Sequence, residues 1–251
     1  MSVLTLRLAG PLQSWGASAR FARRTTESAP TKSGVIGMLA AAAGIERDDD
    51  ERLKPLAALR FGVRIDQPGT RVRDFHTAHH GVTGKSMPLS ERFYLADAVF
   101  VAALEGDHPL LAELHAALRA PVYAPFLGRR SCPPSLPVEL HLHDHGGLQD
   151  VLREEPWQAS PWYRKQYRGQ DDIELTVLRE ADEHELTVLR EADEHEQNAA
   201  DTLRDQPLSF AAEHRRHTLR TQVTCSVRIP NPSARQLPRH DPFDALDEES
   251  A

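Results

Sequence analysis

The sequence is poor in cysteine, in aromatic residues and in long apolar runs. Its two cysteines, Cys132 and Cys225, are far apart and lack the spacing of a disulfide framework or a zinc motif, which favours a reducing, cytoplasmic setting. Aromatic residues make up only 6% of the chain, which argues against a broad base-stacking surface. No apolar run approaches the roughly 18 residues of a membrane span, so we expect no membrane partner.

A net charge of −7 hides an uneven distribution of charged residues. Residues 171–205 carry 13 Asp or Glu and 3 Arg, a balance of −10. Residues 1–130 carry 17 Lys or Arg and 13 Asp or Glu, a balance of +4. A mildly basic N-terminal half is compatible with nucleic acid but does not require it.

The order of apolar patterns predicts an α+β fold. Segments in which apolar and polar residues alternate predict strands. An apolar run after Thr31 or Ser33 predicts a helix that ends at Gly44, and residues 109–118 predict a second helix. The expected strands are 3–8, 59–65, 71–75, 92–104 and 138–142, the expected helices are 35–43 and 109–118, and 48–50 is an expected charged turn. Segment 71–75 is the expected hairpin partner of 59–65. The order β-α-β-β-α-β is typical of ferredoxin-like and RRM-type domains.

The remainder of the chain is expected to form less regular parts. We predict an RRM-like domain over 1–145 with a long extension at 76–92, then a smaller β-rich part over 146–237 that contains an acidic insert at 171–205. Strand character is good over 220–229, and 238–251 reads as a disordered acidic tail.

An exact repeat lies within the acidic segment. Residues 174–184 recur letter for letter as 185–195. An 11-residue period keeps apolar side chains on one helical face, so a long helix is possible. We favour a duplication in an exposed connection, without a function of its own.

Three segments combine glycine with basic or hydroxyl side chains where an apolar element meets a loop: 6–16, 30–44 and 125–134. Glycine lets a backbone approach phosphate closely. At the predicted helix start, free N–H groups, Lys32 and Ser33 converge, and Arg129 and Arg130 suit phosphate. Plain helix capping and plain surface charge remain equally open.

Other candidate chemistry is weaker. The 81–86 segment has His79 where a phosphate loop needs its first glycine, and Pro88 prevents the following helix. His141, His143 and His145 alternate as zinc or copper ligands would, but no cysteine or carboxylate cluster completes a ligand set, so we expect no metal and no cofactor.

Two further segments leave alternatives open. His76 could act as a general base toward a ribose 2′-OH, with Lys85 and Tyr94 nearby. The 157–168 segment interleaves aromatic and basic residues, which suits either single-stranded nucleic acid or the edge of a core or protein interface.

Taken in order, these motifs resemble the CasD family of the type I-E CRISPR surveillance complex (Cascade), within the RAMP superfamily. The matching stretches are 6–16, 30–45, 74–77, 94–104, 126–134 and 204–210, with Arg215 and Arg216. The Leu-Gln-Ser-Trp-Gly and Leu-Gly-Arg-Arg-Ser-Cys-Pro-Pro pieces are the most specific. The repeat, the acidic tail and residues 79–91 depart from the family pattern.

The resemblance implies a non-catalytic RNA-binding subunit of an antiviral ribonucleoprotein. Such a subunit holds the 5′ handle of the CRISPR RNA and caps the complex, with an RRM-like palm and a protruding thumb hairpin. It packs against the backbone subunit, contacts the large subunit, and meets target DNA only through the complex. A related subtype cuts repeat RNA, so a metal-independent endoribonuclease is the alternative.

These arguments select two sets of residues. The expected RNA contacts are Gln13, Ser14, Trp15, Arg23, Arg24, Lys32, Ser33, His76, Lys85, Arg92, Arg129, Arg130 and Ser131. The expected partner contacts are Met87, Leu89, Trp162 and Tyr163. No catalytic residue and no metal ligand is expected.

Overall fold

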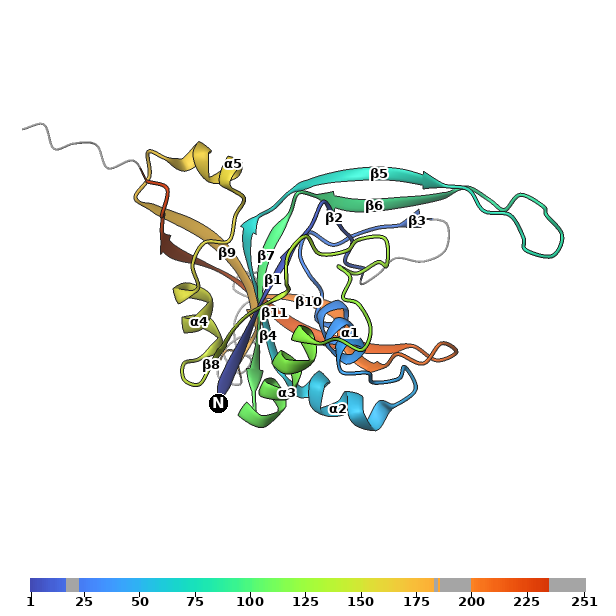
Figure 1. Cartoon of the computed structure of the whole chain (residues 1–251), viewed down its shortest axis with the longest axis horizontal. Helices are drawn as coiled ribbons and strands as arrows, with labels where there is room; N and C mark the ends of the chain where they lie inside the picture. Colours follow the sequence, from blue (N-terminus) through green and yellow to red (C-terminus); the bar gives the residue numbers. More distant parts are fainter. Residues whose placement is uncertain (17–22, 183–184, 186–199, 235–251) are drawn as a thin grey trace, which may run out of the picture.

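Four antiparallel strands and two helices form the centre of the computed structural model, which describes residues 1–16, 23–182, 185 and 200–234. The chain runs through β1 (Ser2–Ala9), α1 (Lys32–Ala42), β4 (Arg60–Gln67), β7 (Val99–Gly106), α3 (His108–Arg119) and β8 (Glu139–His143). These strands lie in the order β4-β7-β1-β8, the arrangement of a ferredoxin-like domain (Figure 1). The predicted fold class is therefore confirmed.

Both faces of this sheet are covered, which explains why β1 is buried along almost its whole length. Leu4, Leu6 and Leu8 face the main core with α1, α3 and the extra helix α2 (Asp50–Ala58). Val3 joins a second core with α4 (Leu148–Glu154) on the other face. Side chains on alternate faces thus hold helices on both sides of one strand.

The ends of the first two helices follow from local capping. Thr31 is the N-cap of α1, where its hydroxyl accepts a hydrogen bond from the Gly34 N–H at 3.3 Å. Asp49 caps α2 by accepting from the Arg52 N–H at 3.0 Å. The expected charged turn at 48–50 therefore leads into a helix that the sequence analysis missed, because Pro55 lies inside it.

The predicted strand 92–104 is two strands. Asp97 has a φ of +58°, and the chain bends there between β6 (Ser90–Ala96) and β7. β6 leaves the main sheet and pairs with β5 (Thr70–His76), β2 (Leu12–Gln13) and β3 (Arg23–Arg24). The expectation that 71–75 pairs with 59–65 is therefore wrong: its partner is β6.

The β5–β6 ribbon protrudes from the body of the molecule (Figure 1). His76 pairs with Ser90 at the outer end of the ribbon, and an exposed loop, 77–89, closes it. A single bridge joins His79 to Ser86 within that loop. The expected thumb hairpin is present, with strands that begin at Thr70 rather than at residue 76.

Three C-terminal strands extend the main sheet beyond β4. After α4, the short helix α5 (Pro161–Arg164) and the 3₁₀ helix η1 (Lys165–Tyr167) lead to β9 (Asp172–Glu180), β10 (Ala200–Ser209) and β11 (Arg216–Pro230). The full order is β10-β11-β9-β4-β7-β1-β8. The sheet is continuous across residue 145, and the division into 1–145 and 146–237 stays a prediction.

The acidic segment contributes a central strand. Residues 174–180 of the first copy lie in β9, where Leu175 and Val177, like Ile173 just before the repeat, point inward. This part of the repeat is therefore neither a helix nor an exposed connection. The second copy, apart from Glu185, and the tail at 238–251 lie outside the described residues. None of the helices within those residues is long and apolar enough to cross a membrane.

Candidate nucleic-acid interface

A cleft of about 1270 Å³ lies between α1, the loop after residue 123 and the β10–β11 connection. Ser33 and Gly34 line one wall, Gly128 and Arg130 line the second, and residues 210–215 with His217 line the third. Burial, and secondarily the charge of Arg215, lowers the pKa of His217. The walls of the cleft therefore come from both the N-terminal half of the chain and the connection between the C-terminal strands β10 and β11.

The glycine-arginine loop packs tightly against the Leu-Gln-Ser-Trp-Gly segment. Gly128 has a φ of +81°, and a Cβ there would lie 1.8 Å from the Ser14 carbonyl oxygen, so only glycine fits. The Ser14 N–H donates to the Leu127 carbonyl at 3.1 Å, and the Leu127 N–H donates to the Cys132 carbonyl at 2.7 Å. This packing fixes the base of the loop that carries Arg129 and Arg130.

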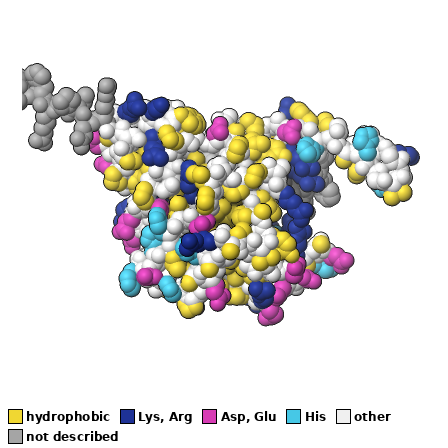
Figure 2. All heavy atoms as spheres, in the orientation of Figure 1, with side chains coloured by type: hydrophobic (Ala, Val, Ile, Leu, Met, Phe, Trp, Pro, Cys, Tyr) yellow, Lys and Arg dark blue, Asp and Glu magenta, His cyan; other side chains and the backbone are white. Residues whose placement is uncertain are grey.

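Arginines from three separate segments lie beside this loop and along the ribbon, where Arg24 pairs with Arg92 two residues from the outer end. We define the arginine cluster as Arg23 and Arg24 of β3, Arg92 of β6, and Arg129 and Arg130 of the loop. The Arg129 guanidinium lies 4.6 Å from the centre of the Tyr94 ring, and its Nη2 donates to the Arg24 carbonyl at 3.0 Å. Figure 2 shows Lys and Arg side chains gathered beneath the ribbon.

The cluster keeps much of its positive charge uncompensated. Arg23 and Arg73 share one carboxylate, Glu91, at 3.8 Å each, and Arg23 also packs on Phe93, so these two lie on the face of β6 opposite to Arg92 and Tyr94. Within the described part of the chain, no carboxylate pairs with the other four members of the cluster, and Arg92 Nε and Arg129 Nη1 are shielded from solvent without a hydrogen-bond partner. Guanidiniums that lack a carboxylate partner can bind phosphate oxygens or base edges.

The Leu-Gln-Ser-Trp-Gly segment supports this interface from inside. Gln13 is fully buried, and its Nε2 donates to the carbonyls of Leu8 (3.0 Å) and Ala98 (2.8 Å). Its Oε1 accepts from Trp15 Nε1 at 3.0 Å, and Trp15 is also fully buried. Ser14 Oγ donates to the Phe93 carbonyl at 3.0 Å. These three side chains, which we expected to contact RNA, therefore form their hydrogen bonds within the protein.

The start of α1 is also occupied from within. The Lys32 N–H donates to Asp205 Oδ2 at 2.7 Å, and Lys32 Nζ lies 2.8 Å from Glu180 Oε1. Arg220 in turn holds Asp205 with two hydrogen bonds of 2.9 Å. Burial lowers the pKa of Lys32, opposed by Glu180. Asp205 stands where we expected a phosphate, and only Ser33 of this pair lines the cleft.

The three groups of the proposed endonuclease are not assembled. His76 pairs with Ser90, whereas Tyr94 pairs with Val72, so the two side chains are about 13 Å apart along the ribbon at 3.3 Å per residue. Tyr94 is buried beneath Arg129, and Lys85 is exposed in the loop beyond. Proton transfer needs hydrogen-bond contact, which this spacing does not provide.

The expected partner residues lie on two other surfaces. Met87 and Leu89 are about half exposed (49% and 51%) in the ribbon loop. Trp162 is exposed on α5, whereas Tyr163 is half-buried, and burial together with Tyr167 raises its pKa to about 12. Trp157 is buried and donates from Nε1 to the Asp66 carbonyl at 3.0 Å. The aromatic-basic segment is therefore largely the edge of the second core.

Sequence reasoning missed several neighbours of the interface. Arg71 donates to the Thr26 carbonyl at 2.9 Å, and Arg73 lies on the same ribbon strand. Their alternation along 71–75 was a usable signal, because alternate residues of a strand share a face. The remaining expected contact, Ser131, is exposed next to the buried Cys132, whose thiol pKa is raised by burial.

Apart from this interface, His141, His143 and Glu155 form a group with metal-ligand geometry.

Comparison with known proteins identifies the family. The sequence model of the family described as "CRISPR-associated protein (Cas_Cas5)" matches residues 3–223. The chain is 38% identical over 157 residues to the "CRISPR system Cascade subunit CasD" of Escherichia coli strain K12, covering 55% of this chain and 70% of the relative.

Two solved structures are similar over almost the whole chain. One, titled "CRISPR RNA-guided surveillance complex", has a TM-score of 0.68 and 29% identity and covers 98% of both chains. The other, titled "Crystal structure of Cas protein", has a TM-score of 0.63 and 32% identity and covers 94% of this chain and 99% of that one. The chain belongs to the Cas5 family of CRISPR-associated proteins, and its motifs are those of the CasD type.

Proposed function

We propose that the chain is a non-catalytic RNA-binding subunit of a CRISPR surveillance ribonucleoprotein in the cytoplasm, where it holds the 5′ handle of the CRISPR RNA and caps one end of the complex. Its partners would be the CRISPR RNA, the backbone subunit and the large subunit, with target DNA reached through the complex. The names of the CasD relative and of the surveillance complex support this assignment.

The arginine cluster is the observation that carries the proposal. Its members come from segments far apart in the sequence, and the stacking of Arg129 on Tyr94 and its hydrogen bond to the Arg24 carbonyl hold the loop of Arg129 against β6 and β3. A rigid group of guanidiniums with free donors suits the phosphates and splayed bases of a single-stranded RNA. The adjoining cleft is large enough to take an unstacked nucleotide.

A role without catalysis agrees with the same geometry. Arg129 is fixed by a ring and a carbonyl, an arrangement that suits holding a ligand in place. The separation of His76 from Tyr94 along the ribbon favours binding over the endoribonuclease alternative. Incubating the chain with repeat RNA in EDTA should yield no product; specific cleavage that His76→Ala abolishes would establish the alternative.

Two exposed surfaces would receive the protein partners. Met87 and Leu89 on the ribbon loop would dock on the backbone subunit, while Lys85 on the same loop would meet RNA. Trp162, with Tyr163 behind it, forms a second exposed surface on α5. Exposed aromatic and apolar anchors of this kind are enriched at the centres of protein interfaces.

Binding of a labelled single-stranded RNA with the sequence of the handle tests the proposal. Arg129→Ala with Arg130→Ala should weaken binding and flatten its dependence on salt, by about 0.7 in the slope for each lost phosphate contact. Arg119→Ala with Arg153→Ala is the matched control, because both are exposed on helices outside the cluster. An unchanged slope in the cluster variant would show that RNA binds elsewhere.

A further inference from the structure

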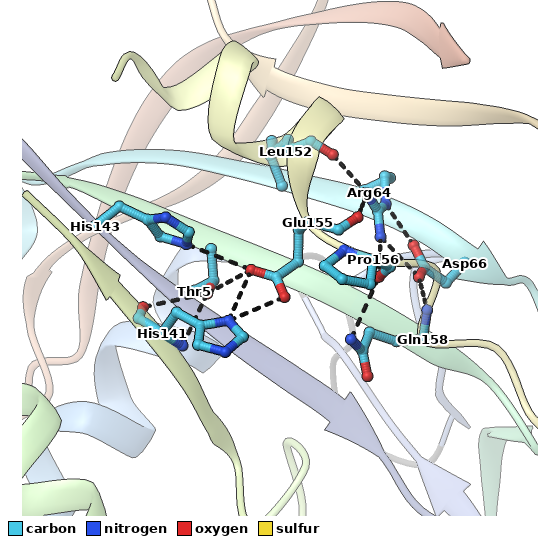
Figure 3. Close-up of polar contacts among 9 residues, drawn as sticks. All are labelled: Thr5, Arg64, Asp66, His141, His143, Leu152, Glu155, Pro156 and Gln158. Atoms are coloured by element: carbon cyan, nitrogen blue, oxygen red, sulfur yellow. Dashed lines mark hydrogen bonds and ion pairs between the residues drawn. The ribbon is translucent and has the colours of Figure 1, made fainter. Parts of the chain in front are cut away.

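We propose that His141, His143 and Glu155 form a binding site for one divalent transition-metal ion, with Zn²⁺ as the ion that suits them best. His141 and His143 are alternate residues of β8, so their side chains share a face. Glu155 is the C-cap of α4 and reaches that face from the neighbouring element. Figure 3 shows both imidazoles directed at the Glu155 carboxylate.

The distances between the ligand atoms match a metal centre. His141 Nδ1 lies 3.1 Å from Glu155 Oε1 and 3.3 Å from Oε2, and His143 Nε2 lies 3.4 Å from Oε2. One ligand atom from each of the three residues lies within 4.8 Å of the other two. Bonds of 2.0–2.1 Å in a tetrahedral arrangement separate neighbouring ligands by about 3.3 Å, so small side-chain adjustments would admit the ion.

The charge at this site also calls for a cation. The Glu155 side chain is completely buried, and a buried carboxylate is unfavourable unless it is compensated. Its partners are Thr5 Oγ1 and the two imidazoles; within the described part of the chain no Lys or Arg pairs with this carboxylate, because Arg64 bonds to the Glu155 backbone carbonyl and to Asp66. His143 Nε2 is shielded from solvent and forms no hydrogen bond within the described part of the chain. A divalent cation would satisfy both groups.

Neighbouring groups hold the three ligands in place. Thr5 Oγ1 donates a hydrogen bond to Glu155 Oε2 at 3.0 Å. Thr5 Oγ1 also accepts a hydrogen bond from the backbone N–H of His141 at 3.1 Å. Arg64 anchors the Glu155 backbone at 2.6 Å. Hydrogen bonds of this kind orient metal ligands and raise metal affinity. The framework is therefore in place without the ion.

The ligand types favour zinc over magnesium or calcium. Two imidazoles and one carboxylate suit zinc and its neighbours, whereas magnesium and calcium prefer oxygen ligands. His141 is largely exposed, which leaves a position open to water. The ion would tie β8, at the edge of the main sheet, to the end of α4, so we assign it a structural role.

The third histidine of the sequence motif is not a ligand. His145 lies with His108 and Asp144 around a separate depression. The sequence analysis dismissed a metal here because no cysteine or carboxylate cluster completed a ligand set; Glu155 is ten residues beyond His145 and is brought back by α4. His145 thus offers a matched control within the same motif.

Zinc titration of the metal-free full chain, in competition with a coloured chelator, tests the proposal. The wild type should bind one Zn²⁺ per chain and gain melting temperature on binding. His141→Ala and His143→Ala should each lower the affinity at least tenfold, and the double variant should lose both responses. His145→Ala should behave as the wild type. Cobalt bound in the same site should give the intense visible absorption of a low-coordinate ion.

The controls separate this site from adventitious binding at surface histidines. Equal affinity in the wild type and in the double variant would overturn the proposal, as would a loss in His145→Ala as large as that in His143→Ala. The two ligand histidines are exposed or half-exposed, so both alanine variants are expected to fold. Glu155→Gln, checked for folding by circular dichroism, should also lose at least tenfold in affinity.

Discussion

Arg64 satisfies all of its N–H donors in the interior of the molecule. Its Nε and Nη2 bind the two oxygens of Asp66 at 2.7 and 2.9 Å. Nη1 donates to the carbonyls of Leu152 and Glu155 at 2.6 Å each, and Nη2 donates to that of Pro156 at 2.9 Å. One arginine of β4 thereby fixes the segment after α4, including the backbone of Glu155.

Removing the partner of this arginine should be strongly destabilising. Asp66→Ala leaves a fully buried guanidinium without its counter-charge, and we expect a loss of about 3–5 kcal/mol in the free energy of unfolding. The exposed pair of Arg153 with Asp150, 3.6 Å apart on α4, is the control; Asp150→Ala should change stability by less than about 0.5 kcal/mol. Urea unfolding followed by circular dichroism measures both. Similar losses in the two variants would contradict the argument.

His217 predicts a pH dependence. Burial first, and Arg215 second, lowers its pKa below the ordinary value of 6.5, against the opposing charge of Asp205. Below pH 6.5 the unfolded chain therefore binds the proton more readily than the folded chain, so stability falls as the pH falls through that value. His217→Gln should reduce the drop in urea midpoint between about pH 7.5 and pH 5.5. An identical drop in both proteins would show that His217 does not contribute.

Some contacts were readable from sequence and others were not. Gly128 was singled out because glycine permits a close approach, and its Cβ position is indeed filled by Ser14. Lys32 was misjudged because its partners, Glu180 and Asp205, lie 148 and 173 residues further along the chain. Local patterns indicate which backbone conformation a residue needs, but they do not show which distant charge will meet it.

The repeat shows how pairing decides between two periodicities. Its 11-residue period suits a helix, yet the alternation of Leu175 and Val177, which continues from Ile173 just before the repeat, suits a strand. In the fold, β9 pairs with β11 over nine residues and with β4 on its other side. Those partners lie outside the repeat, so its own sequence could not settle the conformation.

Removing one copy of the repeat should leave the fold intact. Deleting 185–195 yields the same sequence as deleting 174–184, so β9 is preserved either way. Arg179 now binds Glu185 at 2.6 Å, which holds the pKa of that carboxyl at about 2; in the shortened chain Glu196 follows His184 and can take this place. Shortening the 19-residue connection between β9 and β10 changes closure entropy by less than about 1 kcal/mol.

Thermal unfolding and RNA binding measure the effect of this deletion. We expect both to match the full chain, apart from the small change in closure entropy. Deletion of 200–210, a segment of the same length that removes β10, is the control and should unfold the sheet edge and open the cleft. Loss of RNA binding in the 185–195 deletion would assign a function to the second copy.

The bend at Asp97 adds the protruding β5–β6 ribbon to the ferredoxin-like domain. Without it, 92–104 would continue as one strand, as the sequence analysis expected. The bend sends β6 away from β7, and Gly69, with a φ of +72° and no room for a Cβ beside Ala96, lets β5 follow. The arginine cluster lies along this ribbon beyond its base, beside Arg92 and Tyr94, so the same two turns also position the candidate interface.

The whole molecule combines parts that differ in how well sequence predicts them. The ferredoxin-like centre was predictable because each element carries its own periodicity and the order of elements is restrictive. The cleft was not, because one wall comes from the β10–β11 connection, which reaches α1 through the added strands. The metal-ligand group was missed for the same reason: Glu155 joins the histidines only after α4 has packed on the sheet.

We predict that the loop at the outer end of the β5–β6 ribbon serves assembly of the complex rather than folding of the chain. Residues 77–89 are exposed throughout, and Val82, Met87 and Leu89 are 91%, 49% and 51% exposed, so the loop adds little to the core. Replacing 77–89 by Asn-Gly would join the paired residues His76 and Ser90 through a two-residue turn. The shortened chain should keep its melting temperature and should still bind handle RNA through the arginine cluster.

The variant with 77–89 replaced by Asn-Gly should be impaired in binding to the neighbouring subunits of the complex. Loss of Met87 and Leu89 removes two apolar anchors, and we expect binding to the neighbouring subunits in the presence of RNA to weaken at least tenfold, which corresponds to about 1.4 kcal/mol. Lys85→Ala in the intact loop is the control, because it removes the charge alone and should lower only the salt dependence of RNA binding. Co-purification of the complex and protection of the 5′ end of its RNA measure the two effects. If the shortened chain assembled with undiminished affinity, the docking surface would have to lie on the body, with the exposed Trp162 of α5 as the next place to test.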